Sequence, residues 1–219
     1  MISTTALVRY LTHPQVQIDP AVAVPSWGLS AIGRGRVQAL VEAGWLKGTT
    51  QIVSSGERKA VETAEPIAAA LGLGVEINEA MHENDRSATG FLPPREFESV
   101  ANEFFTYPDR SVRGWERAID AQARIVREVE SVLSRDQPGD VLLVGHGAVG
   151  TLLFCHHSKV AIARVHEVDP SAAQQVLLRE AEDGRPRRVH ALHAAVEPGQ
   201  RQEVRREIEE ARQQGVKFL

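Results

Sequence analysis

The sequence has little cysteine and no long apolar run, and each shortage excludes a class of protein. Its single cysteine, Cys155, permits neither an internal disulfide nor a thiolate zinc site, and it fits a reducing compartment. No apolar stretch approaches the roughly 18 residues that a bilayer-spanning helix needs, and residues 1–5 lack the basic and apolar segments of a secretory signal. We therefore expect a cytoplasmic protein with no membrane partner.

The chain also lacks an excess of positive charge. It carries 29 acidic and 25 basic residues, and its net charge of -4 offers nucleic acid no global attraction. We expect no nucleic-acid partner, and any bound anion must be held by a local site. The content of 42% hydrophobic and 25% charged residues is typical of a globular protein, and the length suits a single domain over residues 1–219.

Segments typical of strands alternate with segments typical of helices. The sequence predicts strands at residues 6–12, 51–55, 75–77, 140–144, 174–179 and 188–193. It predicts helices at residues 30–45, 57–71, 148–155 and 199–214, the last with a polar, solvated surface. Ser30 can cap the first helix, whose buried face is predicted to hold Ile32, Val37, Leu40, Val41 and Trp45. The alternation predicts an α/β fold, a three-layer αβα arrangement with a mostly parallel central sheet.

Residues 94–134 are mostly helical in pattern, with a break at residues 107–109. Two arrangements are open for them. They could cover one face of the sheet, or they could form a helical insert beside it.

Polar clusters follow three of the predicted strands, at residues 12–14, 54–59 and 145–147. Because the carboxyl ends of parallel strands meet at one edge of a sheet, we expect these clusters to lie together. Two histidines, a cationic pair and the N–H groups of a helix start would form an anion site with a nucleophile. A phosphoryl group suits such a site, and glycines beside His146 would let the backbone approach it.

The same residues resemble the histidine phosphatase superfamily, also called the phosphoglycerate-mutase-like family. The resemblance covers residues 6–157. Its motifs are, in order, residues 11–14 (LTHP), 27–33 (WGLSAIG), 54–64 (SSGERKAVETA), 81–83 (MHE) and 144–149 (VGHGAV). Each motif alone is weak evidence, whereas all of them in the family's order strongly favour this fold.

Carried over position by position, the resemblance implies three catalytic residues. His13 matches the histidine that accepts the phosphoryl group, Glu83 the proton donor, and His146 the second catalytic histidine. It also implies four phosphate-binding positions, which are held by Thr12, Arg58, Lys59 and Gly147. Of the two neighbouring cations, the helical register favours Lys59 over Arg58 as the residue that faces the phosphate.

The chain departs from the family pattern in its first motif, where Thr12 replaces an arginine and Pro14 a glycine, and at Lys59, which replaces another arginine. Neither threonine nor lysine reproduces the bidentate grip of a guanidinium on phosphate. Arg86 could supply the charge that Thr12 lacks.

These features together predict a metal-independent phosphomonoesterase that acts through a phosphohistidine, without a cofactor, on a phosphorylated small molecule or peptide. A catalytically impaired relative that binds a phosphorylated ligand or a protein partner is the alternative. A mutase is a third reading, although nothing in the chain specifies phosphoglycerate. Residues 13–27 and 84–94 are expected to supply substrate contacts, and the oligomeric state is left open.

A metallohydrolase built on His156, His157 and His166 is the weakest reading, because no carboxylate-rich or HExxH pattern accompanies these histidines. His156 and His157 are interpreted as structural or surface residues. Cys155 is interpreted as a small core residue.

Overall fold

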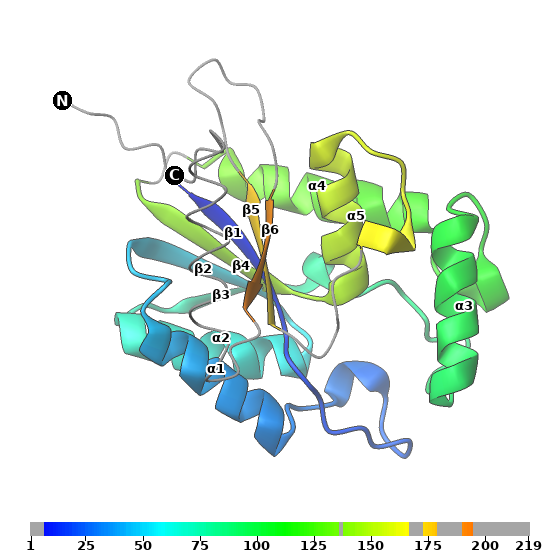
Figure 1. Ribbon diagram of the computed structural model, residues 1–219, viewed down its shortest axis with the longest axis horizontal. Helices are drawn as coiled ribbons and strands as arrows, with labels where there is room; N and C mark the ends of the chain where they lie inside the picture. The colour runs from blue at the N-terminus through cyan, green and yellow to red at the C-terminus, as the bar shows by residue number, and fades with distance from the viewer. Residues whose placement is uncertain (1–6, 136–137, 167–172, 179–189, 195–219) are drawn as a thin grey trace.

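A six-stranded sheet forms the centre of the protein in the computed structural model, which describes residues 7–135, 138–166, 173–178 and 190–194 (Figure 1). The strand order is β3-β2-β4-β1-β5-β6. The strands are β1 (Val8–Thr12), β2 (Thr49–Ser55), β3 (Val75–Asn78), β4 (Asp140–Gly145), β5 (Ala173–Leu178) and β6 (His190–Ala194). β1 to β4 pair in parallel, whereas β5 and β6 are antiparallel. The predicted strands and the mostly parallel sheet are confirmed.

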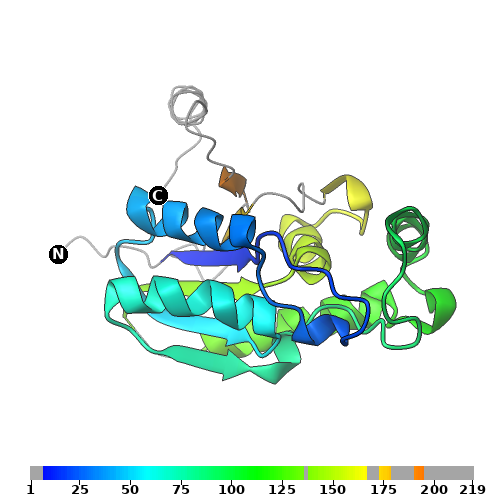
Figure 2. The ribbon, with the colours of Figure 1, turned by 90° about the horizontal axis from the view of Figure 1, so that it is seen from below.

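Helices cover both faces of the sheet (Figure 2). The α-helices are α1 (Ala31–Ala43), α2 (Arg58–Leu71), α3 (Pro94–Thr106), α4 (Ala118–Leu133) and α5 (Gly147–Ser158). The short 3-10 helices are η1 (Val24–Ser26), η2 (Glu79–Met81), η3 (Val112–Gly114) and η4 (Arg164–His166). α1 and α2 lie on one face, and α4 and α5 lie on the other, which confirms the three layers. The helix predicted at residues 199–214 lies outside the described residues.

The apolar run of β4 is explained by this double cover. Leu142 and Val144 belong to the core under α1 and α2, whereas Val141 and Leu143 belong to the core under α4 and α5. Successive side chains of a strand point to opposite faces, so a strand that is buried on both faces is apolar throughout.

The first helix confirms its predicted cap but not its whole predicted face. The Ser30 hydroxyl accepts a hydrogen bond from the Gly33 N–H, and Gly44 ends α1 in a left-handed conformation with φ 69°. Val37 and Leu40 are buried, but Ile32 is 58% exposed, so its assignment to the buried face was wrong. Five residues turn a helix through about 500°, which places Ile32 well away from the direction of Val37.

The segment between β3 and β4 contains two differently placed helices. α4 belongs to the layer over the sheet, where Ile125 and Val129 are fully buried. α3 stands to one side of the sheet (Figure 1) and contacts η3 and η4, with Phe104 packed near the Trp115 ring.

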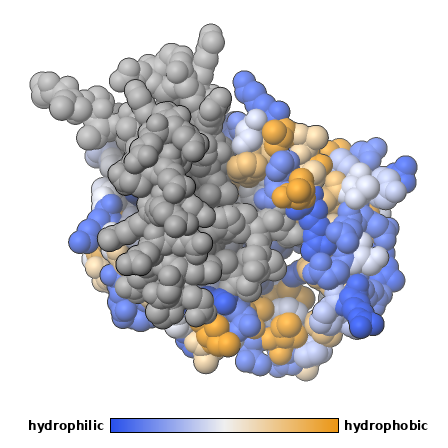
Figure 3. All heavy atoms as spheres, in the orientation of Figure 1, coloured by the Kyte–Doolittle hydropathy of each residue, from blue (hydrophilic) through white to orange (hydrophobic). Residues whose placement is uncertain are grey.

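The coloured part of the surface in Figure 3 is mainly hydrophilic, with separate groups of apolar side chains. None of the helices in the described part of the chain is long and apolar enough to span a membrane.

The topology places the site at one edge of the sheet. Thr12 pairs with Gly145, and Ser54 pairs with Val144, so β1, β4 and β2 end side by side. The backbone N–H of His13 continues this ladder by donating to the Gly145 carbonyl at 3.0 Å. The segments that follow these three strands are therefore held together, as the sequence predicts.

Candidate active site

His13 and His146 face each other at the carboxyl ends of β1 and β4. Their ring centroids are 5.3 Å apart, with the rings nearly edge to face. His146 is fully buried and lies at the N-cap of α5. The structure thus brings together the two histidines that the sequence singled out.

His13 is held in the tautomer that leaves Nε2 free. Its Nδ1 lies 2.9 Å from the Pro14 carbonyl oxygen, which can only accept, so Nδ1 carries the proton. Burial lowers the pKa of His13, the charges of Lys59 and Arg86 add to this effect, and the hydrogen bond to Pro14 and the Glu57 charge oppose it, so that the pKa of His13 is about 4. At neutral pH the imidazole is uncharged, with an available Nε2 lone pair, as a nucleophile requires.

Ser55 holds the imidazole ring of His146. The Ser55 hydroxyl oxygen accepts from the Glu57 N–H at 3.3 Å and lies 2.8 Å from His146 Nε2. The hydroxyl can donate to Nε2 or accept from it, since its oxygen has two lone pairs. Within the described residues the buried Nδ1 of His146 has no hydrogen-bond partner. Burial holds the pKa of His146 well below its ordinary value, so the ring is neutral.

Tyr10 holds the backbone of His146. Its hydroxyl accepts from the His146 N–H at 3.0 Å and donates to the His146 carbonyl at 3.4 Å. A Cβ on Gly145 would lie 2.1 Å from that hydroxyl, and one on Gly150 would lie 2.8 Å from the ring. Gly145 is therefore required by the packing of Tyr10, whereas the space around Gly147 is open.

The Glu83 carboxylate lies on the N-terminus of α5. It accepts from the N–H groups of Ala148 at 3.3 Å and Val149 at 3.1 Å. Burial raises the pKa of Glu83, although the Arg86 charge opposes this shift. A carboxyl group with a raised pKa retains its proton to higher pH, which suits a proton donor.

Arg124, from the middle of α4, fixes the loop that carries Glu83. Its guanidinium donates to the carbonyl oxygens of Ala80 and His82, each at 2.9 Å, and of Glu83 at 3.2 Å. It also pairs with the Glu116 carboxylate at 2.7 Å. Sequence reasoning missed Arg124, because a basic residue inside an amphipathic helix is usually solvated.

Lys59 and Arg58 point in different directions. The Lys59 side chain is 3% exposed, and its ammonium donates to the Val24 carbonyl at 3.0 Å and to the Glu57 carboxylate. The Arg58 side chain is 63% exposed and binds Glu62, one helical turn later, at 2.6 Å. Lys59 is thus the buried cation beside the histidines, and Arg58 lies at the rim.

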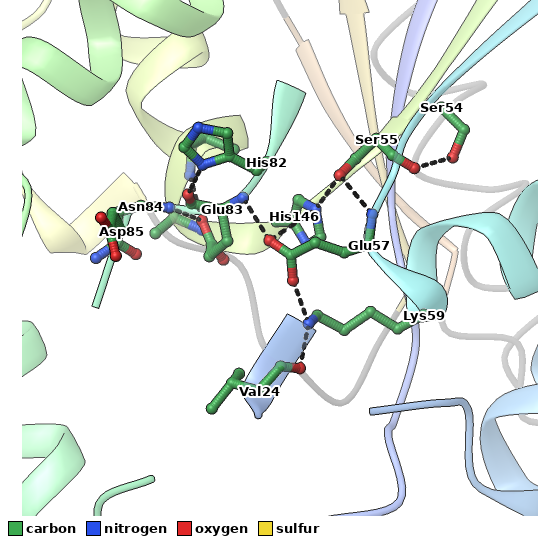
Figure 4. A network of polar contacts seen from close by, with 12 residues as sticks. Val24, Ser54, Ser55, Glu57, Lys59, His82, Glu83, Asn84, Asp85 and His146 are labelled. Carbon is green, nitrogen blue, oxygen red and sulfur yellow. Dashed lines mark hydrogen bonds and ion pairs between the residues drawn. The ribbon is translucent and has the colours of Figure 1, made fainter. Parts of the chain in front are cut away.

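Glu57 is a buried carboxylate at the centre of this network (Figure 4). Its Oε1 accepts from the Glu83 N–H at 2.9 Å and lies 3.6 Å from His146 Nε2, while its Oε2 pairs with Lys59. Burial alone would raise its pKa, but the Lys59 ammonium and the hydrogen bond from the Glu83 N–H hold the pKa of Glu57 below its ordinary value. Sequence reasoning treated Glu57 only as the start of a helix, where acidic residues are common.

A cavity of about 750 Å³ opens beside Glu57 and Glu83. Residues 23–26 line one side of it, and residues 84–87 line another, so both segments that were expected to contact substrate border the cavity. Arg86 is among the lining residues, and its guanidinium lies 5.0 Å from the centre of the Phe97 ring.

Of the site residues that the sequence predicts, Arg58 and Glu83 line this cavity, whereas Thr12, His13, Lys59, His146 and Gly147 do not. Thr12 is buried at the end of β1, and Gly147 is the first residue of α5. The rings of His156 and His157 contact each other at 5.2 Å, and neither lines the cavity. Among the described residues, no group of three or more His, Cys, Asp or Glu could hold a metal ion. Cys155 is fully buried in the core, as expected.

Comparison with known proteins identifies the family of the chain. The sequence profile of the histidine phosphatase superfamily (branch 1) matches residues 22–191, and the chain belongs to this family. No curated protein sequence matches the chain.

Several solved structures share its fold. Mycobacterial glucosyl-3-phosphoglycerate phosphatase is 22% identical over 84% of this chain and 97% of that one, with a TM-score of 0.69. The protein described as mycobacterial hydrolase 2 is 21% identical over 92% and 97% of the two chains, with a TM-score of 0.70. Phosphoserine phosphatase from Entamoeba histolytica, a mutant in complex with phosphoserine, is 13% identical over 83% and 94%, with a TM-score of 0.67.

Proposed function

We propose that the protein is a metal-independent phosphomonoesterase that acts through a phosphohistidine on a phosphorylated small molecule or peptide. The observation that carries the proposal is the hydrogen bond from His13 Nδ1 to the Pro14 carbonyl, which leaves Nε2 free opposite His146. Membership of the histidine phosphatase superfamily supports it, as do structural neighbours that are phosphatases of small phosphorylated molecules.

In the first step, His13 Nε2 attacks phosphorus, and the bond to the leaving oxygen breaks. The proton of the Glu83 carboxyl passes to that oxygen as it departs. In this mechanism the Ser55 hydroxyl donates to His146 Nε2, and the proton on His146 Nδ1 is donated in a hydrogen bond to a phosphoryl oxygen. The charges of Lys59 and Arg86 offset the negative charge of the transferring group. In the second step, the Glu83 carboxylate takes a proton from water as the water oxygen attacks phosphorus, the bond from phosphorus to His13 Nε2 breaks, and phosphate leaves with the neutral imidazole and the protonated Glu83 restored.

The test is a screen of aryl, sugar, nucleotide and peptide phosphates in excess EDTA, with His13→Ala as the matched variant. Wild-type protein should hydrolyse an aryl phosphate in EDTA, and His13→Ala should lose several orders of magnitude in turnover, because the covalent route is gone. An acid-free quench with labelled substrate should trap acid-labile label on His13. Label on another residue, or activity that requires an added metal, would contradict the proposal.

Glu57 favours a second candidate function, that of an impaired relative which binds a phosphorylated ligand without turning it over. Its carboxylate forms an ion pair with Lys59, the buried cation of the site, and Thr12 supplies no positive charge in place of the family's arginine. The same screen separates the two functions, because such a protein would bind phosphate and hydrolyse none of the substrates.

A further inference from the structure

Glu57 lies among the groups that a phosphoryl group needs, and a carboxylate is an unexpected neighbour for a phosphate. It pairs with Lys59, lies 3.6 Å from His146 Nε2 and is itself only 9% exposed. The cavity beside it is large enough for the rest of a substrate. Any phosphoryl group that approaches His13 and Lys59 therefore also approaches the Glu57 carboxylate.

The carboxylate is held where it is. The backbone N–H of Glu57 donates to the Ser55 hydroxyl. The carboxylate accepts from the Glu83 N–H at Oε1 and forms an ion pair with Lys59 at Oε2. Moving Glu57 aside would leave the buried Lys59 and the Glu83 N–H without these partners, which is costly. The carboxylate is thus a fixed part of the site.

The charges around Glu57 do not compensate for two more negative charges. The titratable groups around Glu57 are Tyr10, His13, Lys59, Glu83 and His146, and Arg58, Glu79, His82, Asp85 and Arg86 also line the cavity. Both histidines and Tyr10 are neutral at neutral pH, Lys59 is already paired with Glu57, and Arg58 is paired with Glu62. Arg86 adds a positive charge to the cavity wall, and Glu79 and Asp85 add carboxyl groups to it.

A phosphate monoester ionises for the second time near pH 6, so both its charge forms occur in the physiological range. The dianion has no proton and is repelled by the carboxylate. The monoanion has one P–OH group, which can donate a short, charge-assisted hydrogen bond to Glu57. The interaction with Glu57 is therefore attractive for the monoanion and repulsive for the dianion.

We propose that Glu57 selects the charge state of the bound phosphoryl group, so that the site accepts the monoanion and rejects the dianion. The inference rests on the proposed function only in that it places a phosphoryl group between His13, Lys59 and His146. It adds a specificity-determining residue, and it does not require turnover.

The experiment measures the affinity of the full chain for inorganic phosphate by titration calorimetry, from about pH 5.5 to about pH 8.5, across the second ionisation of phosphate. If the monoanion alone binds, wild-type Kd should rise about tenfold per pH unit above that ionisation. Glu57→Gln keeps an oxygen for the Glu83 N–H but removes the charge. It should bind phosphate at least about tenfold more tightly than wild type at the alkaline end, with a flattened pH dependence.

Two further variants serve as controls. Glu65→Gln, at an exposed position of the same helix, should keep the wild-type pH dependence. Ionisation of Glu83 also adds negative charge to the site as the pH rises. Glu83→Gln removes this ionisation but leaves Glu57 in place, so its affinity for phosphate should still fall as the pH rises. An unchanged slope in Glu57→Gln, or weaker binding by that variant at every pH, would overturn the proposal.

A second test uses only the wild-type protein, so it does not depend on whether a variant folds. Sulfate has the shape of phosphate but carries no proton in this pH range, so it should bind much more weakly than phosphate at about pH 5.5. Equal affinity for the two anions, or no affinity for phosphate, would overturn the proposal. Both experiments measure anion binding and not turnover. Hydrolysis without selectivity for the monoanion would therefore contradict only the role of Glu57. Selectivity without hydrolysis would contradict only the proposed phosphatase activity.

Discussion

The guanidinium of Arg124 donates to the carbonyl oxygen of Glu83 at 3.2 Å, while the carboxylate of the same Glu83 accepts from the first N–H groups of α5. The proposed proton donor is therefore fixed at its backbone by α4 and at its side chain by α5. Neither helix contains Glu83 itself, so its position depends on the packing of these two helices against each other.

Replacing Arg124 with methionine should impair proton donation without removing a group that touches substrate. Arg124→Met keeps the apolar stem but loses the bonds to the carbonyl oxygens of Ala80, His82 and Glu83. We expect kcat on alkyl phosphates to fall about tenfold, with a smaller loss on aryl phosphates and little change in KM. Arg127→Met, an exposed change on the same helix, is the control. Equal losses on both substrate types would show that Arg124 supports the fold and not the position of Glu83.

The proton donor itself can be tested through the basicity of the leaving group. Glu83→Gln keeps the size of the side chain and one oxygen for the N-terminus of α5, but has no acidic proton. An alkoxide needs a proton as it leaves, whereas an aryl oxide leaves without one, so turnover of alkyl phosphates should fall by roughly 10²-fold or more and that of aryl phosphates much less. A series of leaving groups measures this as a steeper dependence of rate on leaving-group pKa. An unchanged slope would direct attention to Asp85 and His146 as donors.

Lys59 and Arg58 should differ sharply when each is replaced by alanine. The buried Lys59 ammonium lies beside the histidines, so Lys59→Ala should cost roughly 2 to 4 kcal/mol of transition-state stabilisation, the usual scale for one lost electrostatic donor. Arg58 is paired with Glu62 at the surface, and Arg58→Ala should cost far less. The measurement is kcat/KM on one aryl phosphate. The reverse ranking would mean that Arg58 holds the phosphate.

The pH profile of kcat/KM should follow from two shifted pKa values of the protein, in addition to the second ionisation of the substrate near pH 6. Because burial lowers the pKa of His13 to about 4, protonation should silence the nucleophile only below about pH 4, and activity should rise with pH through that value. Because burial raises the pKa of Glu83, loss of its proton should reduce turnover of alkyl phosphates only above the ordinary range of a carboxyl group. The profile is measured over the range in which circular dichroism shows an intact fold. An acidic limb near 6.5 would show that His13 titrates as an ordinary histidine.

The sequence is sufficient to predict the parts of the site that depend on local pattern. His13 and His146 follow apolar strands, and parallel pairing brings the ends of such strands together, so their meeting could be predicted. The different directions of Lys59 and Arg58 could be predicted, because neighbouring residues of a helix point about 100° apart.

The residues that were missed act through distant partners. In the sequence, Tyr10 is one more strand residue, and only the pairing of β1 with β4 brings its hydroxyl to the His146 backbone. Arg124 has the pattern of a solvated helix residue, and only the position of the loop after η2 gives its guanidinium carbonyl partners. Glu57 is ordinary at a helix start, and only its contacts with Lys59, His146 and the Glu83 N–H make it part of the site. Ile32 is the opposite case, because its spacing predicts a place on the buried face of α1 but the side chain is exposed.

The position of β1 between β4 and β5 has a consequence for the order in which the protein forms during synthesis. β1 is the first strand to be made, but both strands that pair with it lie in the second half of the chain. Until they are made, both edges of β1 are open to incorrect pairing. The two histidines can meet only after this long-range pairing, which is a slow kind of contact to form. Catalytic competence in this chain is therefore a late event in folding, and a nascent chain that ends before β4 cannot assemble the site.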